Sequence, residues 1–315
     1  MNSKLEPWVL VCQGGAGHGA WQAGFIYETR QKDYADFKSC FGTSVGALNC
    51  ALYLQSLVQG YENVLKKWIS IGVSDLICFP NFGDISRIGL VGQKKLIRLI
   101  EENIKKNDIE NICYSENRYL SVFTSISGSS YPYKFGPYKQ CTMAAHDGFS
   151  SLHAALLAST AIRFVFPYVQ QDIMIHRDGG GEKNNPLESA VGIGYEKVLV
   201  LTPDRLKGFT VKRSFFEYIW KIHRQVLRTL IETQVKLKEQ EKWETSTFGG
   251  YKKQIVYLIT PSKNLSFISA FIFSKYKSKE LFELGQKDAE IFFSKLRNGE
   301  VESYDLSKMT LIKEQ

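Results

Sequence analysis

Short, continuous apolar stretches alternate along this chain with longer stretches in which apolar residues recur every three or four positions. The short stretches predict buried β-strands at 8–12, 37–41, 119–125, 173–176, 196–202 and 254–260. The periodic stretches predict helices at 19–30, 46–58, 61–69, 92–106, 149–158, 186–193, 214–242 and 278–297. This alternation predicts a three-layer α/β/α fold, in which a largely parallel sheet carries helices on both faces.

The pattern has no break that would divide the chain into separate domains. The 315 residues are 44% hydrophobic, which is enough for a sizeable core, and no long linker rich in Pro, Gly or Ser interrupts them. We therefore expect a single domain over residues 1–315, with its catalytic motifs within 8–205. The rest, 206–315, is expected to be a C-terminal part of helices and a strand packed on the same domain.

Residues 42–46 have the sequence G-T-S-V-G and lie between a predicted strand and a predicted helix. Gly42 and Gly46 allow a sharp turn and a close approach of neighbouring backbone. Ser44 then lies at a helix N-terminus, where the helix dipole favours negative charge. In this strand–turn–helix context the pattern predicts a nucleophile elbow with Ser44 as the nucleophile.

A second glycine-rich turn, residues 14–19 with the sequence G-G-A-G-H-G, follows the first predicted strand. Such a turn exposes several backbone N–H groups, which suit a phosphate or the oxyanion of an acyl-transfer intermediate. Gly15, Gly17 and Ala20 fit the G-x-G-x-x-A form of the dinucleotide motif, but the Gly-Lys-Ser/Thr ending of a P-loop is missing. A tight turn that needs small residues is a further interpretation. The nearby elbow favours an oxyanion hole.

Asp178 is the candidate general base. It follows the predicted strand 173–176 and is itself followed by Gly179 and Gly180. A carboxylate at a strand end, beside glycines, can approach a serine hydroxyl, so Asp178 is a candidate base for Ser44. The alternative is an ordinary Asp-Gly turn. Open α/β sheets carry their sites at the carboxyl ends of the strands, where both side chains are expected.

Four blocks of sequence, taken in order and spacing, resemble the patatin-like phospholipases. They are G-G-A-G-H-G at 14–19, G-T-S-V-G-A-L-N at 42–49, A-S-T-A with F-P within 158–167, and D-G-G with N-N-P within 178–186. A weaker similarity continues through 198–201 and to Gly285 and Ala289. The joint match is far more specific than any one motif.

The resemblance implies a patatin-like fold and a Ser–Asp dyad in place of a triad. Ser44 would be the nucleophile and Asp178 the base. It further implies an oxyanion hole from the backbone amides of Gly14, Gly15, Ala16 and Gly17, elbow glycines Gly42 and Gly46, and the supporting motif Gly179 and Gly180, with no cofactor and no metal. The implied activity is that of a carboxylic ester hydrolase in lipid degradation. It would be a phospholipase A, a lysophospholipase or a general esterase that works through an acyl-enzyme.

The chain departs from the family pattern at a few positions. Ala16 stands where the family has the third glycine of the oxyanion motif, and His18 stands where it has Arg or Lys. Arg163 stands where a proline is often found. These departures leave the dyad intact and bear on rate and substrate preference.

Other functions fit parts of the same pattern. An α/β-hydrolase with a Ser–Asp–His triad would need His223, which lies in the predicted helix 214–242, and its elbow normally follows several strands, whereas one precedes it here. An acyltransferase would use the same dyad. A member of the fold that binds a lipid or a partner without hydrolysing it is a further alternative.

The resemblance implies a membrane or micellar lipid as substrate. The net charge is +8, from 40 Lys and Arg against 32 Asp and Glu, which suits an anionic headgroup or nucleic acid, the alternative being that the basic residues lie on solvated helix faces. Nucleic acid is not expected, because no zinc finger or RNA-binding motif accompanies the basic residues; no protein partner is identified. The apolar stretches 71–90 and 267–273 suit interfacial docking or a lid, the alternative being that both are core.

The cysteines and the N-terminus favour a cytoplasmic protein, the alternative being delivery by a route that the sequence does not show; peripheral association with a membrane surface is a further interpretation. The six cysteines show no metal spacing, and Cys12, Cys40 and Cys50 fall in predicted strands or a helix, as buried thiols do. Residues 1–7 lack the apolar core of a secretory signal, and no apolar run reaches the length of a spanning helix.

Overall fold

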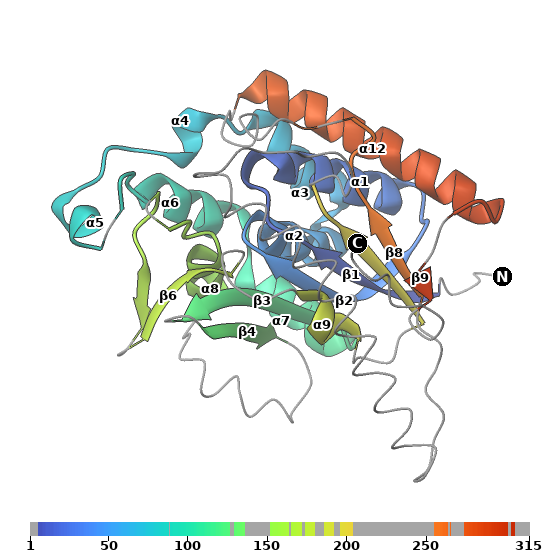
Figure 1. Ribbon diagram of the computed structural model, residues 1–315, viewed down its shortest axis with the longest axis horizontal. Helices are drawn as coiled ribbons and strands as arrows, with labels where there is room; N and C mark the ends of the chain where they lie inside the picture. The colour runs from blue at the N-terminus through green and yellow to red at the C-terminus, as the bar shows by residue number, and fades with distance from the viewer. Residues whose placement is uncertain are drawn as a thin grey trace, which may run out of the picture.

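A central sheet organises the fold (Figure 1). The computed structural model describes residues 6–87, 89–126, 129–135, 152–163, 165–171, 174–179, 186–191, 196–203, 255–263, 265, 274–301 and 304–305. Within these residues the sheet has nine strands, in the order β5-β6-β3-β2-β1-β7-β8-β9, with β4 paired to β3 off this path. They are β1 (Pro7–Cys12), β2 (Asp36–Thr43), β3 (Tyr119–Ile126), β4 (Ser129–Phe135), β5 (Val169–Gln171), β6 (Met174–Asp178), β7 (Lys197–Leu201), β8 (Ile255–Ile259) and β9 (Tyr304–Asp305).

The middle of the sheet is parallel and its margins are antiparallel. Strands β3, β2, β1, β7 and β8 run parallel to one another. Antiparallel pairs join β4 and β6 to β3, β5 to β6, and β9 to β8. The carboxyl ends of the five parallel strands therefore lie at one edge of the sheet, where α/β folds carry their sites.

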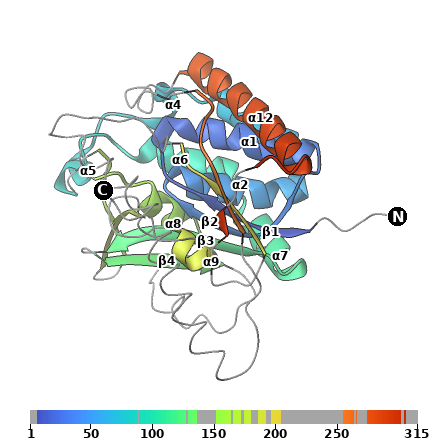
Figure 2. The ribbon, with the colours of Figure 1, turned by 45° about the vertical axis from the view of Figure 1, so that its right-hand side comes forward.

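Helices lie on both faces of the sheet, and most of the described helices share one face (Figures 1 and 2). The described helices are η1 (Ala16–His18), α1 (Gly19–Gln31), α2 (Val45–Gln59), α3 (Tyr61–Leu65), η2 (Lys66–Ser70), α4 (Val73–Leu76), α5 (Phe82–Ser86), α6 (Lys94–Asn103), α7 (Lys106–Ser115), α8 (Leu152–Ser159), α9 (Pro186–Val191) and α12 (Lys275–Arg297). The long helix α12 lies along α1 on the outside of one face. The prediction of a largely parallel sheet between two helical layers is confirmed.

The two faces of β1 explain the two layers of the core. Alternate residues of a strand point to opposite faces. Leu10 and Cys12 join a large buried cluster with α1, α2, α8 and α12. Val9 and Val11 join a smaller cluster, to which α9 contributes Leu187. Burial on both faces produces the continuous apolar runs from which the central strands are predicted.

One predicted helix differs slightly in its extent, and the helix after it is not predicted. The predicted helix 92–106 corresponds to α6, which ends at Asn103, and a separate helix, α7, begins at Lys106. Between them Ile104 is extended and buried, and the backbone N–H of Lys105 donates to Oε1 of Gln55 at 2.7 Å. A side chain from α2 therefore takes the place of a helical acceptor. The predicted helix 214–242 and the apolar stretch 267–273 lie outside the described residues.

The cysteines behave as predicted. Cys12, Cys40 and Cys50 are buried free thiols. Burial raises the pKa of the Cys40 and Cys50 thiols well above the ordinary value. Within the described residues, no helix is both long and apolar enough to span a bilayer.

Candidate active site

Ser44 forms a strained turn between β2 and α2. Its φ is 55° and its ψ is −131°, a region that non-glycine residues avoid at a cost of about 1–3 kcal/mol. Its backbone N–H donates to Oγ of Ser159 at 2.8 Å, and that hydroxyl donates to the carbonyl oxygen of Phe123 at 2.6 Å. Ser159 therefore ties the elbow to β3 and holds Ser44 in its strained conformation.

Close packing explains the two glycines of the elbow. A Cβ added at Gly46 would lie 2.2 Å from the carbonyl oxygen of Cys12, at the end of β1. A Cβ added at Gly42 would lie 2.4 Å from Cα of Ala47. Both clashes are with backbone, which cannot move aside as a flexible side chain can. Any larger residue at 42 or 46 would displace the first turn of α2 from the sheet.

The glycine-rich turn 14–19 lies beside the elbow. A Cβ built on Gly14 would lie 3.1 Å from Cβ of Ser44 and 3.8 Å from its Oγ, so the backbone of the turn faces the serine hydroxyl. The side-chain amide of Gln22, on α1, fixes the start of the turn. It donates to the carbonyl oxygens of Gln13 at 2.7 Å and of Leu201, at the end of β7, at 3.1 Å.

The three residues that depart from the family pattern lie in different environments. Ala16 begins η1 with a φ of 48°, in the left-handed region that favours glycine. Its Cβ is therefore accommodated, but with strain. Gly17 and His18 are buried in the same short helix. Arg163, in contrast, is exposed, on the segment that follows α8.

The pairing of β3 brings Asp178 toward the elbow. One edge of β3 is occupied by β4 from Leu120 to Ile126. On the other edge, β2 ends with Thr43 opposite Phe123, and β6 ends with Asp178 opposite Thr124. These are consecutive positions of β3, about 3.3 Å apart along the strand.

Two strands of opposite direction therefore meet end to end on one edge of β3. β2 runs parallel to β3 and β6 runs antiparallel to it, so their carboxyl ends face each other. Ser44 comes one residue after the end of β2, and Asp178 is the last residue of β6. The structure thus places Ser44, Asp178 and Gly14 beside the carboxyl ends of β1 and β2.

The backbone of Asp178 is held on two sides, and its side chain is buried. Its N–H donates to the carbonyl oxygen of Ala161 at 3.0 Å. Its carbonyl oxygen accepts from Oγ of Ser125, also at 3.0 Å. The residue is 8% exposed, and Gly179 after it packs on the backbone of Phe123. Gly180 lies outside the described residues.

His176 and Ser159 are site residues whose roles the sequence does not reveal. His176 is fully buried on β6, on the same face as Asp178 two residues later, and its Nδ1 lies 3.3 Å from Oγ1 of Thr124. Burial lowers the pKa of His176 to about 4, so its imidazole is neutral at pH 7. The signal for Ser159 is a buried hydroxyl at the end of an otherwise apolar helix, within the block A-S-T-A. His223, which a triad would require, lies outside the described residues.

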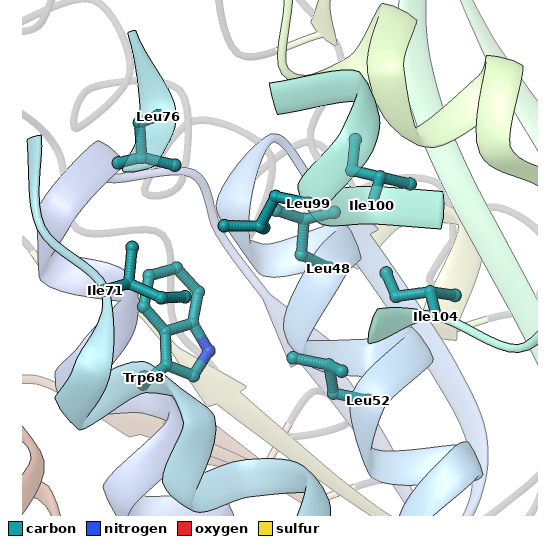
Figure 3. Close-up of a pocket in the computed structure, with 8 residues that line it drawn as sticks. All are labelled: Leu48, Leu52, Trp68, Ile71, Leu76, Leu99, Ile100 and Ile104. Atoms are coloured by element: carbon teal, nitrogen blue, oxygen red, sulfur yellow. The ribbon is translucent and has the colours of Figure 1, made fainter. Parts of the chain in front are cut away.

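An apolar cavity of about 40 Å³ follows Ser44 along α2 (Figure 3). Leu48 and Leu52 come four and eight residues after Ser44, so they lie on its side of the helix. Figure 3 shows side chains from separate elements converging on this space. The lining residues are Leu48, Leu52, Trp68, Ile71, Leu76, Leu99, Ile100 and Ile104. Since a water occupies about 30 Å³ of liquid, an extended chain would enter only if these side chains moved.

A family model described as patatin-like phospholipase matches residues 10–191. Among solved structures, the crystal structure of VipD from Legionella pneumophila matches with 12% identity and a TM-score of 0.39, covering 96% of this chain and 68% of that one. No curated protein matches. The family match spans more than half of the 315 residues, from β1 to α9. The resemblance predicted from the four sequence blocks is confirmed, and the chain belongs to the patatin-like phospholipase family.

Proposed function

We propose that this protein is a serine lipid acyl hydrolase that cleaves carboxylic esters through an acyl-enzyme on Ser44, with Asp178 as the base. In general terms, its family is one of lipid hydrolases. The proposal adds the reacting groups and the type of bond. The observation that carries it is the pairing of Thr43 and Asp178 with consecutive residues of β3.

In the first half of the reaction, Asp178 accepts the proton of the Ser44 hydroxyl while Oγ attacks the ester carbonyl carbon. The backbone N–H groups of residues 14–17 stabilise the resulting oxyanion, at about 3 kcal/mol for each well-directed donor. The intermediate collapses to the acyl-enzyme, and the alcohol leaves with the proton from Asp178.

In the second half, water takes the place of the alcohol. Asp178 accepts a proton from the attacking water, the carbonyl carbon of the acyl-enzyme gains the hydroxyl, and Oγ of Ser44 leaves with the proton. The fatty acid is released and the enzyme returns to its starting state. No cofactor or metal enters this scheme.

The local structure supports these roles. The strained backbone of Ser44 is typical of a nucleophile elbow, because the sharp turn exposes the hydroxyl at the start of a helix. The nearness of Gly14 to Oγ is what an oxyanion hole requires. Burial keeps His176, two residues before Asp178 on β6, neutral at pH 7.

The apolar cavity supports a lipid as substrate. It starts on the side of α2 that carries Ser44, and its lining is aliphatic apart from Trp68. An acyl chain attached to Ser44 would find this surface four residues further along the helix. The segment 66–76 and helix α6, which line the cavity opposite α2, would have to move apart to admit it.

The test combines covalent labelling with product analysis. The wild type should react with a fluorophosphonate probe and release free fatty acid from a panel of lipids, measured by mass spectrometry. Ser44→Ala should abolish both. Asp178→Asn should lower ester turnover by about 10²–10⁴-fold, the contribution of a general base. Ser56→Ala is the matched control, since Ser56 is a buried serine of the helix that follows Ser44, and its hydroxyl donates to the carbonyl oxygen of Tyr53.

The outcomes separate the alternatives. Labelling that persists in Ser44→Ala would contradict the nucleophile, and unchanged turnover in Asp178→Asn would contradict the base. Loss of turnover in His223→Ala, with the fold intact, would favour a triad instead. If an added alcohol captures the acyl group in preference to water, the protein is an acyltransferase with the same dyad.

A further inference from the structure

An apolar arm projects from the body of the molecule between α4 and α6. We use this name for residues 78–92, which are closed at their base by the pairing of Cys78 with Gly92. Figures 1 and 2 agree that its helix α5 lies at an extremity of the molecule. Its large apolar side chains face solvent: Phe79 is 98% exposed, Phe82 88%, Leu90 76% and Ile85 59%.

The arm is ordered by its own hydrogen bonds. Asn81 caps α5, accepting from the N–H of Asp84, while Asp84 Oδ2 accepts from the N–H of Asn81. The carbonyl oxygen of Asp84 also accepts from the N–H of Gly89 at 2.9 Å. Asp84 is 4% exposed, so the polar centre of the arm is directed inward while its phenylalanines are directed outward. Backbone groups that enter an apolar phase need hydrogen-bond partners within the protein, and these bonds supply them for the N–H groups of Asn81, Asp84 and Gly89.

The charges of the arm and of the first turns of α6 are mostly positive. Between residues 78 and 98 the only acidic residue is Asp84, which is buried and lies 3.6 Å from the guanidinium of Arg87. The first turns of α6 carry the exposed Lys94, Lys95 and Arg98. Basic residues next to exposed apolar side chains complement an anionic lipid surface, at about 1 kcal/mol for each Lys or Arg near it.

The arm and the candidate active site both contact the segment 159–165. The N–H of Val91 donates to the carbonyl oxygen of Val165 at 2.9 Å. A few residues earlier on the same segment, Ser159 holds the backbone of Ser44 and Ala161 holds that of Asp178. A surface that engages the arm therefore lies next to the segment that supports both candidate reacting residues.

We propose that the apolar arm docks the protein on an anionic lipid surface, with Phe79, Phe82, Ile85 and Leu90 in the interface and the basic residues of the arm and α6 on the headgroups. A patch of this kind exceeds the scattered exposure of single apolar residues that is normal for proteins. This proposal rests on the proposed function in one respect, namely that the substrate is a lipid. Docking itself does not require hydrolysis.

The test measures binding without turnover. Full-length protein is floated with vesicles of ether-linked phosphatidylcholine, with or without one quarter ether-linked phosphatidylglycerol, because ether lipids have no ester to cleave. The double variant Phe79→Ser/Phe82→Ser should bind the anionic vesicles at least tenfold more weakly, since each buried phenylalanine contributes on the order of a tenfold change in partition. Tyr114→Ser is the matched control, because Tyr114 is a 67% exposed aromatic residue on α7, a helix outside the arm; it should bind like the wild type.

A second pair of measurements separates docking from chemistry. The double variant should hydrolyse a small soluble ester at the wild-type rate and lose activity only on anionic ester vesicles. Lys94→Gln/Arg98→Gln should weaken binding to anionic vesicles severalfold and reduce its dependence on salt. If neither wild type nor variant hydrolyses anything while the binding difference remains, the proposed function fails and docking stands.

Several results would overturn the docking proposal. One is unchanged vesicle binding in a Phe79→Ser/Phe82→Ser variant whose thermal unfolding matches the wild type. Another is equal binding to vesicles with and without phosphatidylglycerol. A third is a wild-type dimer that becomes a monomer in the double variant with no change in vesicle binding, because the arm would then join two copies of the chain.

Discussion

The elbow and the apolar arm are both tight turns, but the protein holds them in different ways. The elbow is surrounded by β1, β3 and the start of α2, and Ser44 is only 6% exposed. The arm is held by its own Asn81–Asp84 cap and by backbone hydrogen bonds to the segment 165–168, while its phenylalanines face solvent. The elbow thereby keeps the residue that carries its hydroxyl in a strained conformation, whereas the arm presents an apolar surface.

The difference also predicts how each turn tolerates change. Strain persists only where the surroundings over-determine it, so the elbow depends on its neighbours. The phenylalanine side chains of the arm face solvent, so substitutions of Phe79 and Phe82 should alter what the arm binds more than how stably the protein folds.

The largest contrast is expected for an added methyl group. Gly46→Ala drives a Cβ against the carbonyl oxygen of Cys12 and should destabilise the fold by about 4 kcal/mol or prevent folding. Gly83→Ala in α5 has only Oδ1 of Asn81 within contact, at 3.2 Å, and should change the free energy of unfolding by less than about 1 kcal/mol. Urea unfolding of both variants measures this. Equal losses of stability would contradict the comparison.

Removal of the Ser159 hydroxyl should have the next largest effect. Ser159→Ala leaves the buried N–H of Ser44 without its acceptor, at a cost of about 1–3 kcal/mol, and should reduce kcat because the elbow loses its tie to β3. Thr160→Ala is the control next to it, since that hydroxyl donates to the carbonyl oxygens of Leu156 and Leu157 on the preceding helix. Thermal unfolding and ester turnover should separate the two variants. A Ser159→Ala variant with wild-type turnover would show that the tie is dispensable.

The smallest effect is expected at Ala16. Its φ of 48° strains a residue with a Cβ by about 1–2 kcal/mol, and glycine removes that strain while adding flexibility to the unfolded chain. Ala16→Gly should therefore stabilise the protein by about 0.5–1 kcal/mol, measured by urea unfolding. A destabilised variant would indicate that the methyl group makes a packing contact worth more than the strain.

Much of the fold follows from local pattern. The central strands are predictable because burial on both faces makes them continuous apolar runs, as in β1 and β7. The elbow is predictable because a side chain at Gly42 or Gly46 would clash with neighbouring backbone, so a turn of this shape requires glycine there. The three-residue β5 and the helix α5 escape prediction, since neither is long enough for a period to be visible.

The assembly of the candidate site is predictable only in part. Sequence order indicates that Ser44 and Asp178 lie at strand ends, but not that β2 and β6 share one edge of β3, because register arises from pairing between distant segments. The exposure of Phe79 and Phe82 is equally hidden, since apolar residues in a sequence are more often buried. The same pattern supports a core, a lid or a docking surface until the contacts are known.

The short pairing of β6 has a consequence for how the enzyme would fail. Three residue pairs join β6 to β3 in the described structure, and β6 is flanked on its far side by the three-residue β5. Short marginal strands open at lower free energy than the centre of a sheet. If Asp178 is the base, mild heating or low denaturant would silence turnover reversibly while the rest of the sheet stays intact, so inactivation and melting would become two separate events.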